Sequence, residues 1–185
     1  MLNSFYDKFI FTNGIQYTHS NFYLVNMPFV MLPADLLAGI AAAEDGAANR
    51  HMYKAIKEAV RQNVRKDFQI DFGVEGEKGL EFMQAYFIAS GWGQMEFNDI
   101  NSEKGHALIS VANSPVAANC KNAKAPVDTV LRGILAGIFS THFRKDVECV
   151  EVKCAALNAQ QCDFIVKPLA EFDFGNPNTR AQLEV

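Results

Sequence analysis

Hydrophobic and polar residues alternate with two different periods in the second half of the chain. From Pro126 onwards, apolar side chains recur three and four positions apart, which is the spacing of one buried helix face. They are Val127, Val130, Leu131, Ile134, Leu135, Ile138 and Phe139. After residue 145 the period becomes two, which places Val147, Cys149 and Glu151 on one face of a strand. With a loop over 155–161 and a strand over 162–166, the pattern predicts a helix followed by a β-hairpin.

The first half of the chain shows the same two periods. Helical spacing favours helices over 33–44, 47–66 and 78–90, and alternation favours a hairpin over 94–100 and 106–112. Short aromatic strands with turns are predicted before residue 33. The expected fold class is therefore α+β, with an antiparallel sheet of about four to five strands flanked by helices and an N-terminal arm of strands or a hairpin.

Length and local composition divide the chain into three parts. Its 185 residues fit one domain. We expect a strand-rich arm over 1–32, a single domain over 33–168 and an irregular tail over 169–185. The aromatic arm is expected to cover either its own core or a second copy of the chain.

Two glycines lie four positions apart in the helix predicted after Pro126. Gly133 and Gly137 each cost about 1 kcal/mol relative to alanine in a helix interior. We therefore expect this helix to approach a neighbouring backbone or a ligand closely.

The only concentrated chemistry in the sequence is the group Glu151, Cys154 and Cys162. Carboxylate and thiolate groups are zinc ligands. In a regular strand Glu151 and Cys154 would face opposite sides, so they can share an ion only if the strand ends or bulges near Val152. The alternative is that the cysteines are small buried apolar side chains.

Three blocks of sequence resemble one known family. They are Gly91-Trp92-Gly93, the run SVANSPVAAN from Ser110, and APVD-x4-G-x3-G followed by a strand and E-x2-C-x7-C-x-F. In these blocks, over about residues 80–168, the chain resembles the 4-vinyl reductase domain family. The resemblance implies a fold similar to that of haem nitric-oxide-binding domains and TRAPP trafficking subunits, often dimeric, with an internal ligand pocket.

The resemblance also implies a structural zinc site. The family pattern places ligands at Glu151, Cys154 and Cys162, and the fourth, a cysteine in sensory members, falls on Asp128. Aspartate can bind zinc through oxygen, and Cys120 is an alternative if its loop folds inward. Four protein ligands would leave no open position, so the metal is expected to be structural rather than catalytic.

A ligand pocket is expected beside the glycine-bearing helix. By resemblance and by apolar character, the candidate lining residues are Trp92, Val111, Ile134, Ile138 and Phe139. Each of them also suits ordinary core packing.

Composition and charge narrow the classes of partner. A net charge of −4 and the lack of a recognition motif argue against nucleic acid. No apolar run reaches the roughly 20 residues needed to cross a bilayer. Four cysteines without an N-terminal signal peptide favour a reducing, cytoplasmic location.

The sequence favours binding over catalysis. Its histidines, at positions 19, 51, 106 and 142, form no recognisable constellation with a cysteine, and no dinucleotide or phosphate motif is present. We expect a non-enzymatic, homodimeric domain that binds or senses a small hydrophobic or aromatic molecule, or a tetrapyrrole. The alternatives are a reductase or accessory protein for the 4-vinyl group of (bacterio)chlorophyll precursors, which the family name suggests, and a structural adaptor in a protein assembly.

Overall fold

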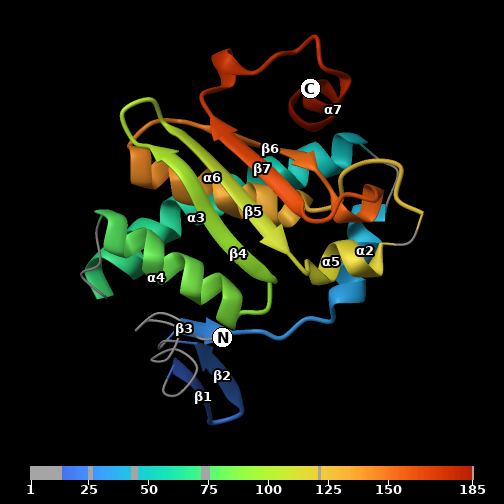
Figure 1. The fold of residues 1–185 in the computed structure, drawn as a ribbon. Helices are drawn as coiled ribbons and strands as arrows, with labels where there is room; N and C mark the ends of the chain where they lie inside the picture. Colours follow the sequence, from blue (N-terminus) through green and yellow to red (C-terminus); the bar gives the residue numbers. More distant parts are fainter. Residues whose placement is uncertain (1–13, 25–26, 43–45, 72–75, 121, 185) are drawn as a thin grey trace.

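A mixed α+β fold is seen in the computed structural model, which describes residues 14–24, 27–42, 46–71, 76–120 and 122–184. The main sheet is antiparallel, in the order β4 (Gln94–Asn101), β5 (His106–Ala112), β7 (Cys162–Lys167) and β6 (Glu148–Lys153). A smaller antiparallel sheet consists of β1 (Ile15–Thr18), β2 (Asn21–Leu24) and β3 (Met27–Phe29), below the main sheet in Figure 1. The expected fold class is confirmed, and residues 1–13 of the predicted arm lie outside the described residues.

Helices cover one face of the main sheet. In Figure 1, α3 (Gly46–Asp71) and α6 (Thr129–Phe143) lie side by side behind the strands, and α4 (Gly76–Ala89) lies beside β4. At one end of the sheet α2 (Ala34–Ala42) packs on the short helix α5 (Pro115–Asn119). The predicted helices are therefore present, with bounds that differ by a few residues.

The core lies between the main sheet and the α3–α6 pair. β5 alternates strictly, with Ala107, Ile109 and Val111 buried and the intervening residues half-buried. Opposite it, α6 contributes Phe139, whose ring meets that of Phe97 edge-on at 5.3 Å. The two periods found in the sequence thus correspond to the two layers of the core.

The close approach expected at the two glycines is confirmed, and the neighbouring backbone is that of α3. A Cβ atom on Gly133 would lie 3.0 Å from the carbonyl oxygen of Tyr53, and one on Gly137 would lie 2.7 Å from that of Lys57. Ordinary Cβ atoms do not come this close to backbone, so glycine allows the observed spacing of the two helices.

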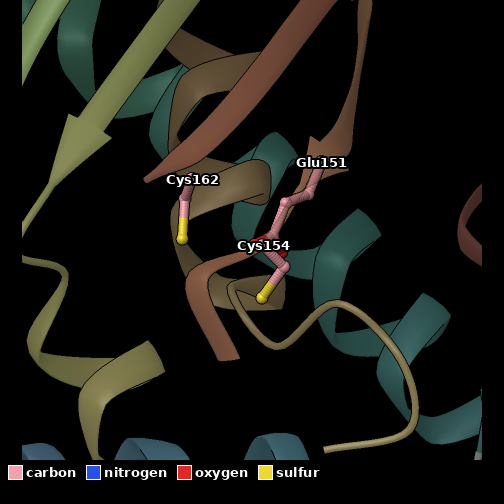
Figure 2. Close-up of side chains that lie close together, drawn as sticks. All are labelled: Glu151, Cys154 and Cys162. Atoms are coloured by element: carbon pink, nitrogen blue, oxygen red, sulfur yellow. The ribbon is translucent and has the colours of Figure 1, made fainter. Parts of the chain in front are cut away.

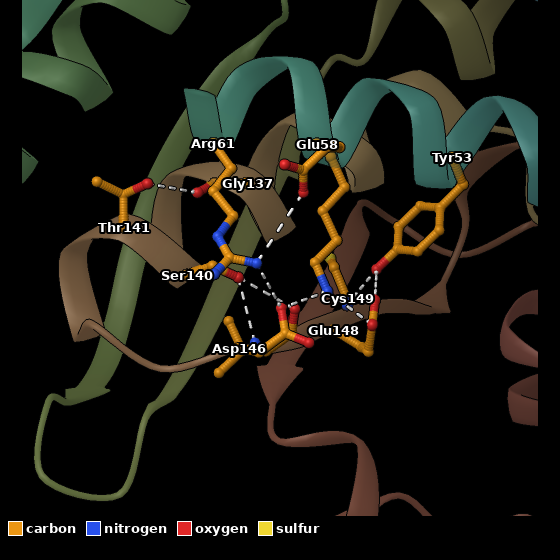
Figure 3. Close-up of polar contacts among 11 residues, drawn as sticks. Tyr53, Glu58, Arg61, Gly137, Ser140, Thr141, Asp146, Glu148 and Cys149 are labelled. Atoms are coloured by element: carbon orange, nitrogen blue, oxygen red, sulfur yellow. Dashed lines mark hydrogen bonds and ion pairs between the residues drawn. The ribbon is translucent and has the colours of Figure 1, made fainter. Parts of the chain in front are cut away.

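Polar side chains tie the same helix pair to the start of β6 (Figure 3). Lys57 forms ion pairs with Asp146 at 2.9 Å and Glu148 at 2.7 Å. The Tyr53 hydroxyl donates to Glu148 at 2.5 Å and accepts from the backbone N–H of Cys149 at 2.9 Å. Burial and the adjacent Glu148 carboxylate raise the pKa of Tyr53, which keeps its hydroxyl protonated as a donor.

The prediction of an irregular tail over 169–185 is wrong for the last part of that segment. α7 (Pro177–Leu183) begins where the Asn176 side chain accepts a hydrogen bond from the Asn178 N–H, and it has proline in its first turn. The buried Gln182 side chain accepts from the backbone N–H of Glu151 at 3.0 Å and donates to its carbonyl at 2.9 Å. The tail therefore supplies the hydrogen bonds that the edge strand β6 lacks on its open side.

Replacing Gly137 by alanine is expected to destabilise the fold. The new Cβ adds up to about 1 kcal/mol of helix propensity, but overpacking against α3 costs about 1–3 kcal/mol. We expect a net loss of about 1–2 kcal/mol in the free energy of unfolding, measured by urea denaturation. The matched control is Gly39→Ala in α2, where, apart from the adjoining backbone of α2 itself, no atom of the described residues lies within 4 Å of the added Cβ. A similar gain in stability from both substitutions would contradict the tight helix contact.

Candidate functional site

Glu151, Cys154 and Cys162 converge in space at one end of the main sheet (Figure 2). Their ligand atoms all lie within 4.8 Å of one another. Glu151 is in β6, Cys154 follows that strand directly, and Cys162 is the first residue of β7. All three side chains are buried. We call this group the thiol–carboxylate cluster.

A bulge at the end of β6 brings Cys154 to the same side as Glu151. The pairing of β6 with β7 shifts register between Glu151 and Lys153, which leaves Val152 as the extra residue. Its side chain is 40% exposed, whereas Glu151 and Cys154 turn inward. The irregularity that the sequence required near Val152 is confirmed.

The turn after Cys154 returns the chain to the cluster. A short 3₁₀ helix, η2 (Ala155–Leu157), ends at Asn158, which adopts a left-handed conformation with φ of 69°. Asparagine tolerates this conformation better than most residues. The backbone N–H of Ala155 then donates to the Cys162 sulfur at 3.3 Å, so both ends of the turn meet at one thiol.

Asp128 extends the cluster from the start of α6. The helix begins at Thr129 rather than at Pro126, with Asp128 in the N-cap position but without a side-chain capping bond. Its carboxylate instead accepts from the Ser114 hydroxyl at 3.5 Å and from the Cys162 thiol, and its N–H donates to Glu151 Oε2 at 3.0 Å. Its oxygens do not belong to the group of ligand atoms within 4.8 Å of one another.

Cys120, the alternative fourth ligand, is directed elsewhere. It is buried at the end of α5, and its thiol lies 3.4 Å from the carbonyl oxygen of Ala38 in α2. Burial and the nearby Asp128 raise the pKa of this thiol. Asp128 is therefore the nearer candidate to complete the set, and both assignments stay predictions.

The cluster cannot hold its full negative charge in the absence of a cation. Burial, together with Asp128 and Cys154, raises the pKa of Glu151 to about 10, and burial raises that of Asp128 to about 6. A hydrogen bond from Cys162 lowers the pKa of Cys154 to about 5 and raises that of Cys162 itself. The cluster therefore retains protons that a bound metal ion would displace.

One buried oxygen in the cluster has no partner. Among the described residues, Glu151 Oε1 is buried without a hydrogen bond, whereas Oε2 accepts from the Asp128 N–H. An unsatisfied buried carboxylate oxygen is costly unless a proton or a metal ion lies against it. The Glu151 carboxylate, one oxygen of which lies within 4.8 Å of two thiol sulfurs, therefore belongs to a donor set that fits a divalent metal ion.

A cleft of about 800 Å³ opens next to the cluster. We call it the lateral cleft. Cys154 lies in its wall, and so does Val127, which immediately precedes Asp128. Just over half of the lining residues come from α2, the segment 122–127 and α7, and the lining includes three cations, Arg50, Lys124 and Arg132.

The sequence did not predict the lateral cleft, because its lining comes from segments far apart in the chain. One local signal was present at Arg132. This charged residue lies between Leu131 and Gly133 on the helix that was expected to be buried, and it is itself 3% exposed.

The five residues predicted to line a ligand pocket lie in or against the main core. Val111 and Phe139 have no exposed surface, Ile138 is buried, and Ile134 packs against them. Trp92 lines a second cavity of about 10 Å³, whose wall includes Val127 and Asp128. A cavity of this size holds about one water molecule. The role of these five residues in ligand binding stays a prediction.

Comparison with protein families identifies the second half of the chain. Residues 108–168 match the V-4-R domain, the domain of the 4-vinyl reductase family. The match spans 61 of the 185 residues, and over this segment the chain is similar to that family. The segment runs from β5 to the end of β7 and contains the whole thiol–carboxylate cluster with Asp128. The family resemblance seen in the sequence is confirmed for this part of the chain.

The fold of nearly the whole chain is similar to that of solved structures. The phenol-responsive sensory domain of the transcription activator PoxR, solved with phenol, has a TM-score of 0.74 and 15% identity, covering 97% of this chain and 96% of that one. A trafficking protein particle complex subunit 3 from Naegleria fowleri, covalently bound to palmitic acid, has a TM-score of 0.54 and 16% identity, covering 72% and 93%. A vinyl-4-reductase family protein from Methanocaldococcus jannaschii has a TM-score of 0.46 and 20% identity, covering 63% and 66%.

At the identities of the first two structures, the shared property is the fold. A search of curated protein sequences gave no match. Within the described residues, no helix has both the length and the apolar character needed to span a membrane.

The substitution Glu151→Gln is expected to reduce the pH dependence of the stability of the metal-free chain. Since folding raises the pKa of Glu151 from 4.5 to about 10, its contribution to stability is complete below pH 4.5 and is lost as the pH rises towards 10. Glutamine does not ionise and keeps an oxygen for the Asp128 N–H. Between about pH 6 and about pH 9, the unfolding free energy of E151Q in the presence of a chelator should therefore fall less than that of the parent.

The matched control is Glu58→Gln, because Glu58 lies on α3 with its side chain 56% exposed. This variant should keep the parental pH dependence. An unchanged slope in E151Q would contradict a buried, titrating Glu151.

Proposed function

We propose that this protein is a non-enzymatic module that binds or senses a small molecule. The observation that carries the proposal is the lateral cleft, whose volume of about 800 Å³ falls within the range of about 300–1,000 Å³ typical of small-molecule sites. A domain of the same fold, that of PoxR, is described as phenol-responsive, which supports the same class of function at the level of fold. The proposed ligand has a hydrophobic or aromatic body.

Trp92 is proposed to lie close to the bound ligand. The lateral cleft and the small cavity at Trp92 share three lining residues, Ala41, Val127 and Thr129. This shared wall lies between the indole and the cleft. Residues Val111, Ile134, Ile138 and Phe139 are proposed to support this wall from the core.

We further propose that the thiol–carboxylate cluster binds zinc, with Asp128 as the fourth ligand. Zinc accepts thiolate and carboxylate ligands, and four protein ligands make a closed structural site. A bound zinc ion would offset the negative charge of the neighbouring acidic groups, which otherwise keeps Glu151 protonated. The four residues join the end of β6, the start of β7 and the start of α6, so the site would hold one wall of the lateral cleft in place.

The chain is also proposed to form a homodimer through its N-terminal arm. The residues that link β3 to α2, and the first turn of α2, expose large apolar side chains. Val30 is 77% exposed, Met31 59%, Leu32 55% and Leu36 50%. Large apolar side chains exposed close together in the chain are typical of a protein interface, so we propose that the described part of the arm and the start of α2 pack against a second copy. The domain over 33–168, with the tail over 169–185 packed on β6, would then bind the ligand.

Native mass spectrometry of the full chain, purified without added metal or ligand, tests the proposed function. We expect a mass of two chains, with one zinc ion per chain and a retained small organic molecule. Gentle collisional activation should release the organic molecule before the zinc, because four protein ligands hold the metal. A monomer that carries neither metal nor small molecule would contradict the proposal.

The substitution Cys154→Ser is expected to abolish zinc binding. Loss of the thiolate removes one of the four groups that hold zinc. Loss of zinc that is present at 100 times its dissociation constant removes about 2.7 kcal/mol of stability. At about 2–4 °C per kcal/mol, the melting temperature should fall by several degrees. Zinc content is measured by elemental analysis and melting by circular dichroism.

Two further variants make the zinc test specific. Cys149→Ser changes another buried cysteine, outside the cluster, and should retain zinc. Asp128→Cys should raise the affinity for zinc, since a thiolate replaces a harder oxygen ligand. An unchanged zinc content in Cys154→Ser would contradict the site.

A further inference from the structure

We propose that the lateral cleft recognises an organic carboxylate, with Arg132 as the buried anchor and Arg50 and Lys124 as supporting cations. The inference rests on the proposed function, small-molecule binding in this cleft, and adds the charge of the ligand. It is carried by the charges that line the cleft and by the bonding of Arg132.

The lining of the lateral cleft is cationic although the chain as a whole is acidic. Lysines and arginines number 17 against 21 aspartates and glutamates in the sequence. Among the described residues that line the cleft, however, the basic side chains are Arg50, Lys124 and Arg132, no aspartate or glutamate is present, and the acidic groups are the thiols of Cys120 and Cys154. The described lining therefore carries more basic than acidic side chains, unlike the chain as a whole, and basic side chains in a cleft concentrate anionic ligands.

Arg132 is a buried arginine whose hydrogen-bond partners are neutral. Its Nε donates to the carbonyl of Cys149 at 3.1 Å, and its Nη2 donates to the carbonyl of Gln182 at 3.1 Å. Its guanidinium carbon lies 4.5 Å from the centre of the Tyr53 ring. These contacts fix the plane of the guanidinium without neutralising it.

The carboxylates nearest to Arg132 have other partners. Glu148 accepts hydrogen bonds from Tyr53 and Lys57, and Glu151 accepts from the Asp128 N–H within the cluster. No carboxylate of the described residues lies within ion-pair distance of Arg132. A buried charge without an opposite charge is costly, so an anion in the cleft would gain more here than at a surface arginine.

The guanidinium still has N–H bonds to offer to a ligand. It carries five, and the described residues accept two of them, at the carbonyls of Cys149 and Gln182, which leaves three. Two N–H bonds in one plane match the two oxygens of a carboxylate. Because Arg132 is among the residues that line the lateral cleft, a carboxylate can approach it from that side.

The first turn of α3 adds to the positive electrostatic field in the lateral cleft. Gly46, Asn49 and Arg50 line the cleft, and they lie at the start of a helix of 26 residues. The N-terminus of a helix carries a partial positive charge that favours anions. The remaining lining mixes polar residues, such as Asn178 and Gln182, with small or apolar ones, and the apolar ones suit an aromatic or aliphatic body behind the carboxylate.

Isothermal titration calorimetry of the full chain with two matched probes tests the inference. The anionic probe is 1-naphthoate, and the neutral probe is 1-naphthalenemethanol, which has the same ring system. We expect the carboxylate to bind about tenfold or more tightly than the alcohol at low salt, with an affinity that falls as salt is added. The fluorescence of Trp92, the single tryptophan, should change with both probes if they occupy the cleft.

Variants separate the contribution of Arg132 to binding from that of Arg50 and Lys124. Arg132→Gln should reduce the affinity for 1-naphthoate to that for the alcohol, and circular dichroism checks that it folds. If it does not fold, the double variant Arg50→Gln with Lys124→Gln decides the question, since Lys124 is exposed and Arg50 is half-buried near the solvent. It should weaken 1-naphthoate binding several-fold and leave the alcohol unaffected. Lys104→Gln, in the turn between β4 and β5, is the control and should change neither affinity.

The outcomes distinguish this inference from the proposed function. Equal binding of both probes, unchanged in the double variant, would overturn the carboxylate inference and leave small-molecule binding intact. Failure of both probes to bind would count against both. The carboxylate inference would be established if 1-naphthoate binds preferentially and this preference is lost in Arg132→Gln and in the double variant but kept in Lys104→Gln.

Discussion

A cluster of buried acidic side chains where β6, β7 and α6 meet is the constraint on which the rest of the structure depends. Glu151, Cys154 and Cys162 bring their ligand atoms within 4.8 Å of one another, and Asp128 joins them through Cys162 and Glu151. An interior of low dielectric cannot hold these groups ionised side by side, which is why the pKa of Glu151 is raised to about 10. Either protons or a metal ion must balance the cluster. Its geometry therefore reflects an electrostatic requirement as well as a packing one.

The strand that carries this cluster is held by three helices. From α3, Tyr53 accepts a hydrogen bond from the N–H of Cys149, and from α6, Arg132 donates to the carbonyl of the same residue. From α7, Gln182 bonds both backbone groups of Glu151. Because β6 is at the edge of the described sheet, these bonds replace the neighbouring strand that it lacks. The close packing of α3 on α6 at Gly133 and Gly137 lets the first two helices reach the strand together.

The parts of this structure that follow from short-range periodicity could be predicted from the sequence, and those that depend on distant contacts could not. The α6 pattern and the two strands after it were evident, and the bulge at Val152 followed from the chemical requirement that Glu151 and Cys154 meet. α5 and α7, at five and seven residues, are too short to show a period and are marked only by their caps. The start of α6 was misplaced because Pro126 suits a first turn, whereas Asp128 marks the true boundary and directs its side chain into the cluster.

The cluster and the lateral cleft are mechanically connected, because they share residues. Cys154 belongs to both, and the first residues of α6, which follow Asp128, also line the cleft. Arg132 is one helical turn beyond Asp128, so a displacement of the start of α6 would move the proposed anchor and the proposed fourth metal ligand together. Linkage between two such sites is reciprocal. A metal ion that orders this wall would therefore favour a ligand in the cleft, and a ligand that holds Arg132 in place would favour retention of the metal.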